Sequence, residues 1–172
     1  NLCVKYLKHT LGCLLMFFDA IVRQIPVFCL LVLCSIAAAK AEENCWYSAA
    51  SRYSVSPHLL YAIASKESSL NPAAIGKNKN GTHDIGLMQV NSVWLPELQK
   101  FGITREKLFD PCVNINVGAW ILAQAVQKLG YNWNAIGAYH TGLGKSERRT
   151  ERRNNYSGDV YRRIERLQRT QN

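Results

Sequence analysis

Two carboxylates near the middle of the chain are the residues best placed to do chemistry. Glu67 ends an apolar stretch of helical periodicity, and Asp84 follows it across a polar, turn-rich segment. A carboxyl group walled by apolar side chains stays protonated near neutral pH and can act as a general acid. Two carboxylates facing each other across a cleft can cleave a glycosidic bond. Taken singly, Glu67 also fits an ordinary solvated helix residue, and Asp84 a turn or capping residue.

The segment directly after Asp84 supplies polar groups that suit a saccharide. Residues 86–91 read Gly-Leu-Met-Gln-Val-Asn, and their alternation places Gln89 and Asn91 on one side of a strand. Amide groups there can hydrogen-bond the hydroxyl and acetamido groups of a sugar. Met88 offers a soft apolar contact for a sugar face. The alternative interpretation is an ordinary hairpin strand with solvated amides.

Most apolar residues after position 41 follow a helical period, which predicts the elements that position these groups. Ser56-Pro57 is typical of a helix start, and this helix carries Glu67 at its C-terminal end. Asp110-Pro111 begins the longest predicted helix, which ends at Gly130. A last helix is predicted to start near Ser157.

The turn signature Asn80-Gly81 predicts the β structure of the domain. Short strands on either side of it would form a small β-hairpin, and Ser92 would cap a further short helix. We therefore expect one mainly α domain, with the β-hairpin beside the active-site cleft.

Residues 1–41 have the pattern of a leader. Arg23 precedes an apolar run that ends in small residues, and Ala39-Lys40-Ala41 fits a signal-peptidase site. The run is about 14 residues long, short of the roughly 20 that a membrane-spanning helix needs. We expect cleavage after Ala41, export to the periplasm and a mature domain over 42–172. An uncleaved anchor is the alternative.

Cysteine usage agrees with export. Only Cys45 and Cys112 follow the leader, which predicts one disulfide that closes a long loop; two reduced, buried thiols are the alternative. No CxxC or HxxxH spacing accompanies these cysteines, so we expect no metal site. No Gly-rich phosphate loop and no activated Ser or Cys nucleophile is present, so no cofactor is implied.

Positive charge gathers at the C-terminus. Residues 145–172 carry 9 Lys/Arg against 4 Asp/Glu, whereas residues 42–144 carry 8 against 7. A basic helix can dock on an anionic polymer or simply present a solvated face. Val160 and Ile164 predict that this helix also packs on the domain. We expect no nucleic-acid partner, because no binding motif accompanies the isoelectric point of about 9.4.

Three short motifs together resemble the soluble lytic transglycosylase domain. They are Glu67-Ser68-Ser69, the Asp-Ile-Gly-Leu-Met-Gln-Val-Asn run of residues 84–91, and Ala138-Tyr139-His140. The chain looks most like the small exported members that accompany type III and type IV secretion systems and conjugative pili. The sequence around Cys45 and Cys112 also resembles that subgroup, and the likeness covers roughly residues 44–168.

The resemblance implies a lysozyme-like fold and an enzyme that cleaves peptidoglycan without water. Glu67 matches the single catalytic carboxylate of the family. The bond broken would be the β-1,4 linkage between N-acetylmuramic acid and N-acetylglucosamine, giving 1,6-anhydro-muramoyl products. Tyr139 matches the tyrosine that hydrogen-bonds the catalytic Glu and also lies at the substrate. The other matching substrate-cleft positions are Ser68, Met88, Gln89 and Asn91.

The resemblance also implies partners, namely peptidoglycan glycan strands and components of a secretion or conjugation apparatus for which the enzyme opens the wall. Two features depart from the family. His140 stands where the family has Asn. The segment 77–92 is similar to c-type lysozymes, in which an aspartate at the place of Asp84 is the second catalytic carboxylate. A hydrolase that uses Glu67 and Asp84 is therefore one alternative, and a non-catalytic peptidoglycan-binding assembly protein is the other.

Overall fold

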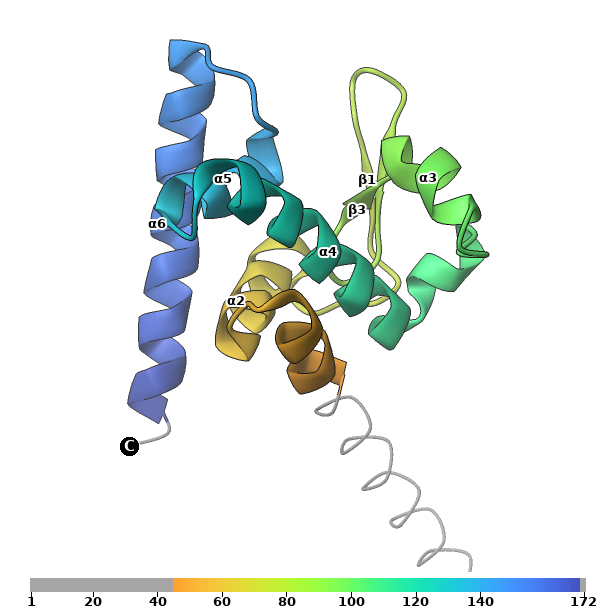
Figure 1. Ribbon diagram of the computed structural model, residues 1–172, viewed down its shortest axis with the longest axis horizontal. Helices are drawn as coiled ribbons and strands as arrows, with labels where there is room; N and C mark the ends of the chain where they lie inside the picture. Colours follow the sequence, from red (N-terminus) through yellow and green to blue (C-terminus); the bar gives the residue numbers. More distant parts are fainter. Residues whose placement is uncertain (1–44, 171–172) are drawn as a thin grey trace, which may run out of the picture. The chain divides into compact units, whose positions relative to one another are not determined.

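A computed structural model describes residues 45–170 as a mainly helical domain with a small antiparallel sheet (Figure 1). The predicted leader and its boundary after Ala41 lie outside the described residues. A helix over 45–53 opens the domain. The remaining elements are α2 (Pro57–Ser68), β1 (Ile75–Lys77), β2 (His83–Ile85), β3 (Val90–Asn91), the 3-10 turns Ser92–Trp94 and Glu106–Phe109, α3 (Leu95–Gln99), α4 (Pro111–Leu129), α5 (Trp133–Thr141) and α6 (Glu147–Thr170).

The sheet contains the predicted hairpin and one strand more. β1 pairs with β2 so that Ile75 lies opposite Ile85, and the connecting turn is closed where the Gly81 amide donates to the Asn78 carbonyl. β3 then pairs with β2 on its other side. This third strand was not expected. It forms because the chain turns back at Gly86–Gln89, where the Gln89 amide donates to the Gly86 carbonyl.

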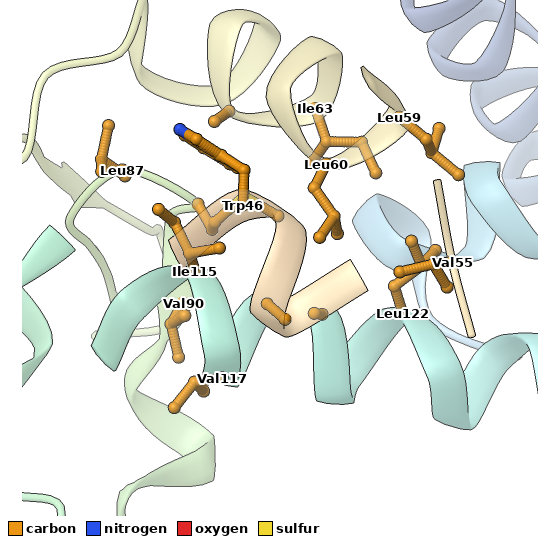
Figure 2. Packing of buried hydrophobic residues seen from close by; sticks show 14 of the residues in the cluster. Trp46, Val55, Leu59, Leu60, Ile63, Leu87, Val90, Ile115, Val117 and Leu122 are labelled. Carbon is orange, nitrogen blue, oxygen red and sulfur yellow. The ribbon is translucent and has the colours of Figure 1, made fainter. Parts of the chain in front are cut away.

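Helix α4 lies at the centre of the domain, as its apolar sequence predicts. Its ends are the predicted ones: the Asp110 side chain accepts a hydrogen bond from the Val113 amide, and Gly130 follows the last turn with a φ of 80°. Ile115 and Leu122 of this helix are fully buried. Figure 2 shows them packed with side chains from α2 and from the helix over 45–53, whose Trp46 lies in the same cluster.

The prediction that the last helix begins near Ser157 is wrong, and so is the prediction that α4 is the longest. Helix α6 begins at Glu147 and has 24 residues, against 19 for α4. Its first two turns are almost entirely charged and exposed, so they carry no apolar period. They are anchored instead by Arg153, whose buried guanidinium donates to the carbonyls of Gly142 and Gly144. Figure 1 shows α6 running beside α5 and α2.

The predicted disulfide is present. Cys45 and Cys112 are bonded across a sequence separation of 67 residues, which ties the helix over 45–53 to the first turn of α4. A crosslink that closes a loop of this length stabilises a fold by about 4 kcal/mol in the chain-entropy account. Among the described residues, no helix is both long and apolar enough to cross a membrane.

Candidate active site

A cleft of about 440 Å³ lies between the sheet and the helices and contains the predicted carboxylates. Glu67 reaches it from the end of α2, and Asp84 from β2. Tyr139 and His140 come from α5, and Arg152 comes from α6. The other lining residues are Asn78, Lys79, Asn80, Thr82, Gln89, Val90, Asn91, Trp94 and Ile121. The sequence-predicted residues Glu67, Asp84, Gln89, Asn91 and Tyr139 are therefore brought together.

Glu67 has the protonation state that a general acid needs. Its side chain is only 15% exposed, and this desolvation raises its pKa from 4.5 to about 7. The hydrogen bond from Tyr156 and the charge of Lys66 oppose the shift, while the negative charge of Asp84 adds to it. A carboxyl group with a pKa near 7 holds a proton at the start of a reaction and takes one back within it.

The tyrosine that donates a hydrogen bond to Glu67 is Tyr156, and the prediction that Tyr139 makes this hydrogen bond is wrong. The Tyr156 hydroxyl donates to Glu67 Oε1 at 2.6 Å. The Tyr139 hydroxyl instead donates to the Met88 carbonyl oxygen at 2.7 Å, which uses its only proton. Tyr139 nevertheless lines the cleft, and burial and the Glu67 charge raise its pKa well above the ordinary tyrosine value.

His140, the departure from the family pattern, belongs to the same cluster. Its ring stacks on Tyr156 with the centroids 4.8 Å apart and the planes 4° from parallel. Its Nδ1 lies 3.9 Å from Glu67 Oε1, and its Nε2 lies 3.4 Å from Arg152 Nη2. Because a guanidinium only donates, Nε2 is the acceptor and the ring proton sits on Nδ1, facing Glu67. Partial burial, followed by the charges of Arg152 and Lys66, lowers the pKa of His140.

Asp84 is held by side-chain amides. Asn91 Nδ2 donates to its Oδ1 at 2.7 Å, and Asn78 Nδ2 donates to its Oδ2 at 2.9 Å. Asn91 also donates to Thr82 Oγ1 at 3.1 Å. Both carboxylate oxygens thus have a fixed donor, which orients Asp84 within the cleft wall.

Gln89 and Asn91 line the cleft, but their side chains also hold its wall together. Gln89 has a left-handed φ of 50°, and its Nε2 donates to the carbonyls of Ala74 and Gly86. The Asn91 Oδ1 accepts from the Val93 amide and so caps the turn that Ser92 was predicted to cap. Ser92 Oγ accepts instead from the His83 amide.

Two predicted substrate residues lie behind the cleft surface. Met88 is completely buried, and its side chain packs against Gly118 of α4, which contradicts the prediction that Met88 contacts a sugar. The Ser68 hydroxyl donates to the Leu87 carbonyl at 2.7 Å, and its Oγ accepts from the Asn71 amide. Ser68 thereby fastens the end of α2 to the Gly86–Gln89 turn and does not line the cleft.

Sequence reasoning missed two residues on which the site depends. Asn114 is fully buried: its Oδ1 accepts from the Met88 amide at 2.7 Å, and its Nδ2 donates to the carbonyls of Ile85 and Leu108. The sequence signal that could have identified Asn114 is a polar residue on the otherwise apolar face of α4. Tyr156 lies one turn before Val160 on α6, so extending the predicted apolar stripe toward the N-terminus would have found it.

No group of three or more His, Cys, Asp or Glu side chains in the described part of the chain is arranged to hold a metal ion. The cleft offers a carboxyl group with a pKa of about 7, the Asp84 carboxylate held by two side-chain amides, and flanking hydrogen-bond donors.

The sequence profile of the transglycosylase SLT domain family matches residues 44–161. The chain is similar to invasion protein IagB of Salmonella typhimurium, with 38% identity over 78% of this chain and 83% of IagB. It is also similar to protein IpgF of Shigella flexneri, with 36% identity over 81% of this chain and 91% of IpgF. A third relative is the X polypeptide of Escherichia coli, 44% identical over 78% of each chain.

Among solved structures, an inactive mutant of the lytic transglycosylase Slt of Pseudomonas aeruginosa superposes with a TM-score of 0.56 and 24% identity. The superposition covers 71% of this chain and 23% of Slt, and it establishes the fold. The predicted mainly α, lysozyme-like architecture is confirmed. The match across residues 44–161 places the chain in the transglycosylase SLT domain family, as a peptidoglycan lytic transglycosylase.

Proposed function

We propose that this enzyme cleaves the β-1,4 bond between N-acetylmuramic acid and N-acetylglucosamine by an intramolecular reaction that gives a 1,6-anhydro-muramoyl end. The observation that carries the proposal is the position of Glu67, whose side chain lies in the cleft only 15% exposed, a burial that raises its pKa to about 7. Protonated Glu67 donates its proton to the glycosidic oxygen. The resulting carboxylate accepts the proton of the muramoyl 6-hydroxyl as that oxygen attacks the anomeric carbon. One group with a pKa near the working pH serves both steps.

Tyr156 and His140 support this double role. The Tyr156 hydroxyl donates to Glu67 Oε1 and so fixes the carboxyl group, while the stacked His140 ring fixes Tyr156. The second oxygen, Oε2, is the one left to meet the glycosidic bond. This arrangement holds the acid in one orientation before the substrate arrives, which lowers the cost of reaching the reactive geometry.

Asp84 has a supporting part in the same reaction. Its carboxylate lies in the cleft with Glu67, and its charge helps to keep Glu67 protonated. A fixed negative charge also stabilises the positive charge that develops at the anomeric carbon as the bond breaks. This placement is what favours the second candidate, a hydrolase in which water is the attacking group. We favour the intramolecular route, because the chain belongs to the transglycosylase SLT domain family.

We further propose that the enzyme is exported to the periplasm, with cleavage after Ala41, and opens the wall locally for a secretion, pilus or conjugation apparatus. The similarity to a Salmonella protein named for invasion supports this role. The disulfide between Cys45 and Cys112 supports folding in an oxidising compartment. Fractionation of producing cells and N-terminal sequencing of the recovered protein test both points. A cytosolic protein with an intact N-terminus would contradict them.

The chemical proposal is tested by digesting purified peptidoglycan and identifying the released sugars by mass spectrometry. The wild-type protein is expected to release anhydro-muramoyl products, and Glu67→Gln is expected to release none. Reducing muramic acid ends in the wild-type digest would instead establish hydrolysis and give Asp84 a direct catalytic role.

A further inference from the structure

A second cavity of about 660 Å³ continues the catalytic cleft on the α4 and α6 side. The two share the residues at their junction, among them Trp94, Tyr139 and His140. Beyond the junction the second cavity is lined by Gln124 and Lys128 of α4, by the segment that joins α5 to α6, and by Arg149 of α6. A polymer bound across Glu67 therefore has room for a branch that leaves its main strand.

The charge of this cavity is of one sign. Among the residues that the structure describes, Lys128 and Arg149 line it and no Asp or Glu does, whereas the adjoining cleft contains Arg152 and Lys79 together with Glu67 and Asp84. The Arg149 Nη1 donates to the Thr141 carbonyl at 3.2 Å, which holds the guanidinium at the cavity wall. Neither Lys128 nor Arg149 forms an ion pair within the described part of the chain. Two cations without a carboxylate partner beside a cleft attract an anionic group.

Gln124 adds a hydrogen-bond donor to the same wall. Its Nε2 is buried and has no hydrogen-bond partner among the residues that the structure describes. A buried amide donor without a partner costs free energy, and Gln124 is one of the residues that line the cavity. The wall thus combines two cations with one unsatisfied donor, which suits a ligand made of carboxylates and carbonyls.

We propose that this cavity binds the peptide stem of the muramoyl residue and that Arg149 and Lys128 recognise the stem's carboxylates. The proposal rests on the proposed function, since it takes a muramoyl residue to lie at Glu67. That sugar carries its peptide through a lactyl group, so the stem must leave the strand beside the scissile bond. Each stem bears several carboxylates and many carbonyl acceptors. The cavity is the space next to Glu67 whose charge is complementary to such a branch.

The consequence is a preference for glycan that still carries charged stems. Lys128 and Arg149 are both exposed, so each contact is screened by salt and contributes modestly. Together they are expected to strengthen binding by about 10-fold at low ionic strength. Glycan whose stem carboxylates are neutral loses this gain while keeping every contact between sugar and cleft.

The test measures binding, so that it does not depend on the reaction. The full chain carrying Glu67→Gln is cosedimented with insoluble peptidoglycan in two forms, native and carbodiimide-amidated, in which the stem carboxylates have become carboxamides. Affinity for native wall is expected to be about 10-fold higher at low salt. Adding Lys128→Gln and Arg149→Gln should reduce that ratio to about 2-fold or less. Adding Lys100→Gln and Arg169→Gln changes the net charge equally at exposed positions away from the cavity and should leave the ratio unchanged.

The proposal would be overturned if the variant with Lys128→Gln and Arg149→Gln kept the full preference for native wall. It would also be overturned if the control variant lost as much of that preference, because the attraction would then be diffuse. Thermal melting of each variant checks that it is folded. If the double variant is not folded, Lys128→Gln alone, at an exposed position, replaces it in the test. Failure of the proposed function appears separately, as an absence of anhydro products from either form of the wall with the unsubstituted protein.

Discussion

Replacing Glu67 with glutamine should make the domain more stable at pH 8 than the wild type, while leaving its stability at pH 4.5 nearly unchanged. Folding places this carboxyl group in a largely desolvated position, with a side chain only 15% exposed, and raises its pKa from 4.5 to about 7. Glutamine has a similar shape, can accept the hydrogen bond from Tyr156 through its Oε1, and never ionises.

The sign and size of the effect follow from linkage. A raised folded-state pKa means that, between pH 4.5 and 7, the folded protein holds a proton that the unfolded chain has lost. The free energy of unfolding of the wild type therefore falls across this window and stays low above it. A shift from 4.5 to about 7, at 1.36 kcal/mol per pH unit, corresponds to about 3 kcal/mol. The Glu67→Gln variant keeps this stability above pH 7, because glutamine does not ionise.

Urea denaturation of both proteins at pH 4.5 and pH 8 measures the difference. The expected result is a gain for Glu67→Gln that is about 3 kcal/mol larger at pH 8 than at pH 4.5. Glu97→Gln is the matched control, because Glu97 lies in an exposed ion pair with Lys100 and its loss should cost less than about 1 kcal/mol at either pH. A gain for Glu67→Gln that is the same at both pH values would refute the raised pKa and, with it, the general acid.

Further substitutions test the surroundings of Glu67 and the scaffold. Tyr156→Phe removes the hydrogen bond that lowers the pKa of Glu67, so the alkaline limb of the pH–rate profile should move to higher pH while the turnover rate falls about 10-fold. His140→Asn removes an imidazole that becomes positively charged in acid beside Glu67, so activity below pH 6 relative to pH 7.5 should rise; an unchanged profile would show that the ring acts by stacking alone. Asn114→Ala leaves three buried backbone groups without their partner and should lower the free energy of unfolding by about 3 kcal/mol or more in urea titrations. Cys45→Ser should cost about 2–4 kcal/mol in the same assay, a loss that reduction of the wild type should reproduce.

Elements with strong local signals could be predicted from the sequence. Ser56-Pro57 and Asp110-Pro111 mark the starts of α2 and α4 because a capping side chain and a proline in the first turn are local properties of the chain. The hairpin around Gly81 follows from turn chemistry in the same way. The start of α6 could not be predicted, because its first turns are charged and depend on carbonyls that Arg153 meets only in the folded domain.

The candidate site could be predicted in part. Glu67, Asp84, Gln89, Asn91 and Tyr139 do meet in one cleft. What the sequence does not contain is the partner of each polar group. Which tyrosine hydrogen-bonds Glu67 depends on how α6 packs on α2. That packing brings the Tyr156 hydroxyl to Glu67, whereas Tyr139 donates to the Met88 carbonyl. Met88 was expected to contact a sugar face because of its soft apolar side chain, but it lies in the Gly86–Gln89 turn with that side chain buried in the core.

The most direct test of the central claim is to digest peptidoglycan in water enriched in oxygen-18, reduce the products at once with borohydride, and analyse them by mass spectrometry. If Glu67 directs the muramoyl 6-hydroxyl onto the anomeric carbon, the released ends are anhydro sugars that lack one water and carry no label. Ends that carry one oxygen-18 atom at the anomeric carbon would show that water is the attacking group, and would contradict the account.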